Sequence, residues 1–133
     1  MRTSIFVFLA VVICGCAIEL PPTTDNINKI FESKDFTFAF INSEGNEKSL
    51  SFVNDYLVYK SEAPTYRREV TYQEVVLINR FIQELLDDHQ NDITSDKSAY
   101  YKVYNTAYKI RMYPKQLGEE RFMELLSFLK LVD

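Results

Sequence analysis

The side chains best suited to chemistry gather in one short stretch, in which Asp87, Asp88 and His89 are followed by Asp92 and Asp96. Carboxylate oxygens can bind Ca²⁺, and an imidazole beside them can act as a general acid or base. The spacing lacks the Asp-x-Asp-x-Asp-Gly pattern of a calcium loop, and solvated polar residues are normal at the end of a helix. We therefore expect no metal site and no catalytic residue, and keep a cryptic hydrolase that uses residues 87–96 as the weakest alternative.

The remaining composition argues against most enzyme classes. The chain of 133 residues has three Gly, two Cys and one His, and both Cys lie within the first 16 residues. So few glycines cannot form a phosphate-binding loop or a dinucleotide-binding fingerprint. A single His without a free Cys cannot form a Cys/His zinc cluster or a thiol nucleophile. We expect a protein that is not an enzyme and needs no cofactor.

The first residues have the pattern of an export signal. Arg2 is the only charged residue before Ile5–Ile13, a run of nine apolar residues. A helix needs about 20 apolar residues to cross the hydrocarbon layer, so this run predicts a signal peptide that is removed. An ordinary secretory signal and an uncleaved anchor remain the alternatives.

The last residue of this run and the three that follow it, Ile13-Cys14-Gly15-Cys16, resemble the lipobox of bacterial prolipoproteins. The resemblance implies that residues 1–15 form a lipoprotein signal peptide, that cleavage follows Gly15, and that Cys16 carries a thioether-linked diacylglycerol and an acyl chain on its new amino terminus. It also implies a location in the bacterial cell envelope. Ala17 resembles the residue found at this position in lipoproteins sent to the outer membrane of cells that have two membranes.

The mature chain would have 118 residues, no free thiol and a net charge of about −5, which suits one domain. Its first part, Ala17–Asn26, contains Pro21 and Pro22 and many polar residues, which favours extended backbone. We expect residues 16–34 to be a lipidated tether that reaches up to roughly 30 Å from the headgroups, and residues 35–133 to be the globular domain.

Period-two alternation predicts the first strands. Residues 35–40 place three Phe on one face, 50–53 and 56–60 follow after turns at 43–46 and 54–55, and 67–70 predict a short fourth strand. Thr71 and Glu74 have the spacing of a capping box, so a helix begins there. Its apolar face repeats every three or four residues: Val75, Ile78, Phe81, Ile82, Leu85 and Leu86.

A second hairpin is predicted over residues 101–112, with its turn at Asn105-Thr106, and a last amphipathic helix follows Glu119 and Glu120. The expected fold is α+β, with a single antiparallel sheet made of a meander and a hairpin and two amphipathic helices on one face. The order of elements resembles the layout of emfourin-type protease inhibitors.

One face of the second hairpin combines aromatic and basic residues. If alternate residues of the hairpin face the helices, the other face carries Tyr100, Lys102, Tyr104, Lys109, Arg111 and Tyr113. Such a patch could bind an anionic glycan, lipid headgroups or an acidic protein, although Tyr and Lys are also common on any half-exposed sheet. The acidic net charge disfavours nucleic acid.

We therefore expect a lipid-anchored, non-enzymatic lipoprotein that binds a protein or an envelope component through this exposed sheet face. The alternative is an inhibitor or immunity-type module that blocks another protein.

Overall fold

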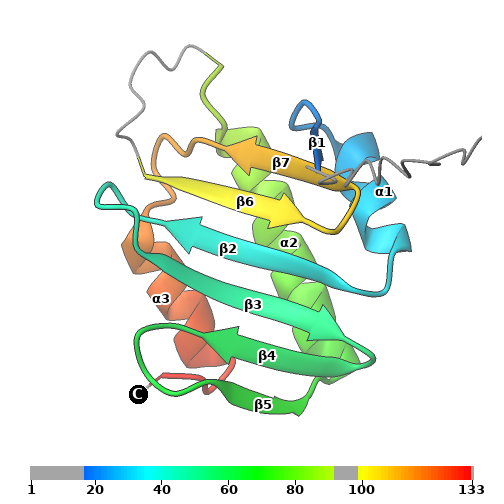
Figure 1. Ribbon diagram of the computed structural model, residues 1–133. Helices are drawn as coiled ribbons and strands as arrows, with labels where there is room; N and C mark the ends of the chain where they lie inside the picture. The colour runs from blue at the N-terminus through cyan, green and yellow to red at the C-terminus, as the bar shows by residue number, and fades with distance from the viewer. Residues whose placement is uncertain (1–16, 92–98, 133) are drawn as a thin grey trace, which may run out of the picture.

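Seven strands form one sheet and three helices cover one of its faces in the computed structural model, which describes residues 17–91 and 99–132 (Figure 1). The strands lie side by side in the order β1-β7-β6-β2-β3-β4-β5. Their bounds are β1 (Ile18–Glu19), β2 (Phe36–Ile41), β3 (Glu47–Val53), β4 (Tyr56–Lys60), β5 (Tyr66–Glu69), β6 (Tyr100–Tyr104) and β7 (Tyr108–Met112). The helices are α1 (Thr24–Glu32), α2 (Tyr72–Asp88) and α3 (Glu119–Phe128).

The expected α+β class is confirmed, but two details of the expected architecture are wrong. The sheet is mixed, because β1 runs parallel to β7, with Ile18 opposite Tyr108 and Glu19 opposite Lys109. The described chain also has three helices, where two were predicted. Both corrections come from the segment before residue 35.

The tether predicted for residues 16–34 is wrong for Ile18–Glu19, which form β1, and for Thr24–Glu32, which form α1. Pro21 and Pro22 end β1, and Thr23 then caps α1 by accepting a hydrogen bond from the backbone N–H of Asn26 at 3.2 Å. Ile27 and Ile30 are 0% exposed, because they point from α1 into the core. The folded domain therefore begins at β1 and not at residue 35.

The predicted meander, its following helix and the second hairpin all form. Asn54 and Asp55 take left-handed backbone, with φ of 49° and 66°, and make the tight turn between β3 and β4. The capping box at the start of α2 has both of its hydrogen bonds, from Glu74 N–H to Thr71 Oγ1 and from Thr71 N–H to Glu74 Oε1. In α2 the core-facing residues are Ile78, Phe81, Ile82 and Leu85, whereas Val75 stays exposed.

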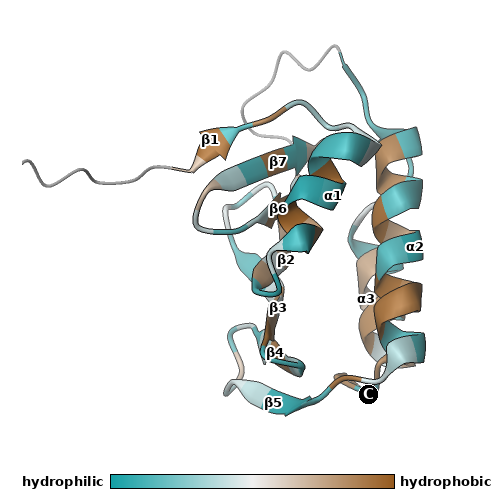
Figure 2. Cartoon of the chain, turned by 90° about the vertical axis from the view of Figure 1, so that its right-hand side faces the viewer, coloured by the Kyte–Doolittle hydropathy of each residue, from teal (hydrophilic) through white to brown (hydrophobic). Residues whose placement is uncertain are grey.

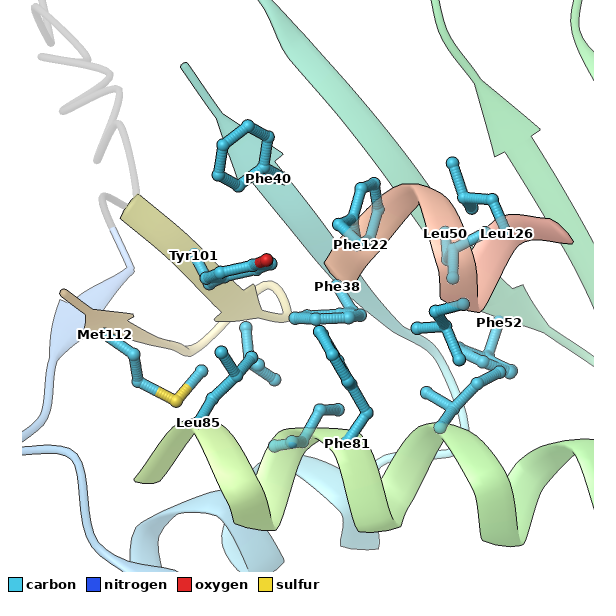
Figure 3. Packing of buried hydrophobic residues seen from close by; sticks show 14 of the residues in the cluster. Phe38, Phe40, Leu50, Phe52, Phe81, Leu85, Tyr101, Met112, Phe122 and Leu126 are labelled. Carbon is cyan, nitrogen blue, oxygen red and sulfur yellow. The ribbon is translucent and has the colours of Figure 1, made fainter. Parts of the chain in front are cut away.

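The core lies between the sheet and the helices, and Tyr101 packs among its aromatic side chains (Figure 3). The Tyr101 ring is surrounded by four Phe rings, with centroid distances of 5.0–5.9 Å to Phe38, Phe40, Phe81 and Phe122. Its buried hydroxyl donates a hydrogen bond to the carbonyl of Gly118 at 2.9 Å, just before α3. One side chain of β6 therefore contacts residues of the sheet, of α2 and of α3.

Arg68 of β5 connects the far edge of the sheet to both α2 and α3. Its guanidinium binds the Glu74 carboxylate through both nitrogens, with Nη1 2.9 Å from Oε1, and also donates to the carbonyl of Leu129 at 2.6 Å. The hydrogen bonds from Arg68 lower the pKa of Glu74 to about 2, against an opposing effect of burial.

Among the described helices, none has both the length and the apolar character needed to cross a bilayer.

Candidate binding surface on the uncovered sheet face

The described helices leave one whole face of the sheet uncovered. Figure 2 shows the helices on one side of the sheet only. Small residues occupy the middle of the uncovered face, where Thr37 lies opposite Ser51 and Ala39 lies opposite Ser49. The hydroxyls of Thr37 and Ser51 are 2.9 Å apart and bind each other. Larger aromatic and basic side chains from β6 and β7 lie to one side of this middle strip.

All six residues predicted for the patch are half-buried on β6, on β7 or directly after β7. Because side chains alternate along a strand, Tyr100, Lys102 and Tyr104 point away from the core side of β6, which carries the buried Tyr101 and Val103. In β7 the same alternation separates Lys109 and Arg111 from the buried Ile110 and Met112. We call the six residues the β6–β7 patch: Tyr100, Lys102, Tyr104, Lys109, Arg111 and Tyr113.

Aromatic rings and cations contact each other within the β6–β7 patch. Lys102 Nζ lies 4.5 Å from the centroid of the Tyr104 ring, and the Arg111 guanidinium lies 5.9 Å from that of Tyr100. The rings of Tyr100 and Tyr113 are 5.5 Å apart. Burial raises the pKa of Tyr104, whose hydroxyl donates to Glu47 Oε1 at 3.5 Å. These contacts hold the side chains of the patch against one another.

The patch is less basic than the sequence predicts, because Arg111 forms an ion pair with Glu19. Arg111 Nε is 2.8 Å from Glu19 Oε1, and Nη2 is 3.0 Å from Oε2. This hydrogen-bonded pair raises the pKa of Arg111. Within the described part of the chain, no carboxylate lies within ion-pair distance of Lys102 or Lys109. These two ammonium groups are therefore the cations that the patch can offer to an anionic ligand.

An open hollow of about 340 Å³ adjoins the patch on the same face. Tyr104 connects the two, since it belongs to the patch and lines the hollow. The hollow was not predicted, because it forms only when four strands, β2, β3, β4 and β6, lie side by side. The signal in the sequence was the alternation of Ser49 and Ser51 with larger residues, which indicates that one face of this strand is uncovered. It is lined by Asp35, Phe36, Thr37, Ser51, Phe52, Val53, Val58, Lys60, Tyr104, Asn105 and Thr106.

The carboxylate of Asp88, which the sequence offers as a possible acid or metal ligand, binds backbone N–H groups. Asp88 Oδ2 accepts hydrogen bonds from the N–H groups of Lys115, Gln116 and Leu117 at 2.9–3.0 Å. Burial alone would raise the pKa of Asp88, but these three donors bring it below its ordinary value. The carboxylate therefore fixes the loop before α3 to the end of α2.

His89 has a similar role beside it. Its Nδ1 accepts a hydrogen bond from the backbone N–H of Tyr113 at 2.9 Å, and the N–H of Gln90 donates to the carbonyl of Tyr113 at 2.8 Å. Burial lowers the pKa of His89, which suits an unprotonated Nδ1. The contacts of Asp88 and His89 thus tie α2 to the segment after β7, and neither contact joins the two side chains to each other.

Cys16, Asp92 and Asp96 lie outside the described residues. Within the residues that are described, no three His, Cys, Asp or Glu side chains gather in a way that could hold a metal ion.

The molecule is thus a two-layer α+β domain with a mixed seven-stranded sheet, whose uncovered face carries an aromatic and basic patch. A scan against models of known families, a search of curated proteins and a search of solved structures each find no match.

Proposed function

We propose that this protein is a lipid-anchored lipoprotein of the bacterial cell envelope that binds a protein or an envelope component through the uncovered face of its sheet. The observation that carries the proposal is the contrast between the two faces. Three helices cover one face, while the other presents the β6–β7 patch and its hollow to the surroundings.

The chemistry of the patch favours an acidic partner surface or an anionic glycan. Tyr rings offer flat apolar area with little rotamer entropy to lose, and Lys102 and Lys109 offer unpaired charge. Asp88 and His89 are engaged in backbone contacts, which supports binding over catalysis.

The lipid anchor is tested by changing Cys16 to Ser in the full chain. We expect the wild-type protein to fractionate with membranes and to incorporate radiolabelled palmitate, because acyl chains on one residue give essentially permanent attachment. The Cys16→Ser variant should lose both properties. Palmitate label on the variant, or an unlabelled wild-type protein, would contradict the anchor.

The patch is tested by reversing its two unpaired charges. Lys102→Glu with Lys109→Glu should reduce the material crosslinked to the protein in native membranes at least ten-fold, because both ammonium groups face the partner. Arg111 is left intact, since its ion pair with Glu19 holds β1 in place.

The matched control makes the same change of charge on the helical side, with Lys29→Glu and Arg80→Glu, which are both exposed. The amount of material crosslinked to this control variant should stay close to that of the wild-type protein. Equal capture by the two double variants, with folding preserved in both, would exclude the patch as the binding site.

A further inference from the structure

The folded domain begins almost directly after the residue that carries the proposed lipid. The N–H of Ile18 donates to the carbonyl of Ala107 at 2.9 Å, and the N–H of Leu20 donates to that of Lys109 at 2.9 Å. Only Ala17 separates this fixed backbone from Cys16. One residue spans at most about 3.6 Å, so the lipid-bearing Cα would lie within roughly 7 Å of Ile18.

The register of the sheet shows which part of the domain is held there. Ile18 lies opposite Tyr108 at the start of β7, which is also the end at which β6 finishes with Tyr104. Thr37, near the start of β2, lies opposite Tyr104, and Phe36 lies opposite Phe52 near the end of β3. We call this side of the domain the anchor end; it is the right-hand side of the sheet in Figure 1.

Exposed apolar side chains gather at the anchor end. Among the described residues, seven large apolar side chains are exposed, and five of them lie here. Ile18 is in β1 and Val53 ends β3, while the other three are in the first turns of α2, where Tyr72 is 82% exposed. The three α2 residues, Tyr72, Val75 and Val76, line a groove of about 310 Å³ together with Phe31, Phe36 and Phe52.

The geometry points to the anchor end as a membrane-contact surface, in which the α2 groove rests on the same bilayer that holds the lipid on Cys16. This inference rests on the proposed lipid anchor. β1 and β3 are four strand spacings apart, or roughly 19 Å, so contact at the groove would give a second point of attachment that stops the domain from tilting. A partner protein fits poorly between this surface and the bilayer. A single helix is already about 10 Å across, which is more than the one-residue link at Ala17 spans.

The charges at the anchor end set the depth of this contact. Glu32 ends α1, Lys34 and Asp35 precede β2, and Asp55 is in the turn after β3. Charged groups stay in water or among headgroups, whereas Tyr72 suits an interface because its ring is apolar and its hydroxyl is polar. The contact therefore lies at headgroup level, and a zwitterionic phospholipid bilayer is the appropriate probe.

The test places a fluorophore at single cysteines in the lipidated full-length protein, reconstituted in phosphatidylcholine vesicles. Cys14 would leave with the leader and Cys16 would be modified, so each introduced cysteine is the one free thiol. Tyr72→Cys and Val76→Cys report on the anchor end. The control is Tyr66→Cys at the opposite end of the sheet, also exposed and opposite Tyr59.

Spin-labelled lipid should quench fluorescence at positions 72 and 76 at least two-fold and leave position 66 nearly unchanged. Equal quenching at all three positions overturns the inference, and so does no quenching at 72 and 76 when mass spectrometry shows the lipid on Cys16. A mass without the lipid overturns the anchor and this inference together.

Discussion

The two faces of the sheet are made from the same strands but are built in opposite ways. On the covered face, Phe38 and Tyr101 are completely buried and touch rings from α2 and α3. On the uncovered face, their strand neighbours Thr37 and Lys102 remain partly exposed. In these two strands, core packing and contact with solvent are therefore separated by one residue, since a single step changes the face. Substitutions on adjacent residues should therefore have unrelated effects.

The sharpest test of this separation pairs Phe38 with Lys102. Phe38→Ala should lower the free energy of unfolding by about 3–5 kcal/mol, because it leaves a cavity at the centre of the aromatic cluster. Lys102→Ala should change it by less than about 0.5 kcal/mol, because its side chain keeps contact with water. Urea denaturation followed by circular dichroism measures both changes. A change above about 1 kcal/mol for Lys102→Ala would contradict the predicted difference between the two faces.

The two ion pairs on opposite faces give the next comparison. Glu74→Gln weakens the enclosed pair with Arg68 and should cost about 2 kcal/mol at pH 7, since one pKa unit corresponds to about 1.4 kcal/mol and some solvent screening remains. Glu19→Gln weakens the more exposed pair with Arg111 and should cost less than about 1 kcal/mol. Urea denaturation of both variants at pH 7 provides the comparison.

The same Glu74 pair predicts the acid response of the fold. The folded-state pKa of Glu74, about 2, lies below that of the unfolded chain, so its contribution is complete above about pH 4.5 and is lost as the pH falls towards 2. Asp88 acts in the same direction, because its pKa is also lowered. The wild-type protein should lose stability over this range more steeply than Glu74→Gln. Parallel pH profiles would contradict the role given to Arg68.

The smallest predicted change in stability comes from removing a Tyr hydroxyl from β6, where two such hydroxyls can be compared. Tyr101→Phe removes the buried hydrogen bond to the Gly118 carbonyl and should cost about 1–2 kcal/mol, because that carbonyl loses its partner. Tyr104→Phe removes a long contact to Glu47 from a part-exposed hydroxyl and should cost less than about 0.5 kcal/mol. Thermal unfolding at equal protein concentration measures both, and equal costs would argue against the difference between the faces.

The elements with strong local signals were predictable from the sequence. The β6–β7 hairpin has alternation and an Asn turn, and α2 begins with a capping box, so both were predicted before any packing is considered. The parallel pairing of β1 was not, because it depends on contact between residues 18–19 and 108–109, about 90 positions apart. Residues 24–32 were missed because Pro21 and Pro22 favoured an extended tether, whereas they lead into a short helix.

The candidate site was only partly predictable for the same reason. Period-two geometry gives the β6–β7 patch, but the pairing of Arg111 with Glu19 depends on the unforeseen β1. The roles of Asp88 and His89 are also set by distant backbone, at residues 113–117. Local pattern identifies which side chains share a face, and long-range contacts decide which of their charges stay available.

The edge of the sheet at β7 has a further consequence for association between copies of the chain. β1 pairs with the first half of β7, Pro21 and Pro22 stop it from extending, and Gln90 and His89 bind Tyr113 just beyond the other end. Open strand edges are templates on which identical chains add to one another. With both ends of β7 occupied in this way, little of its backbone is left for pairing with a strand of a neighbouring copy.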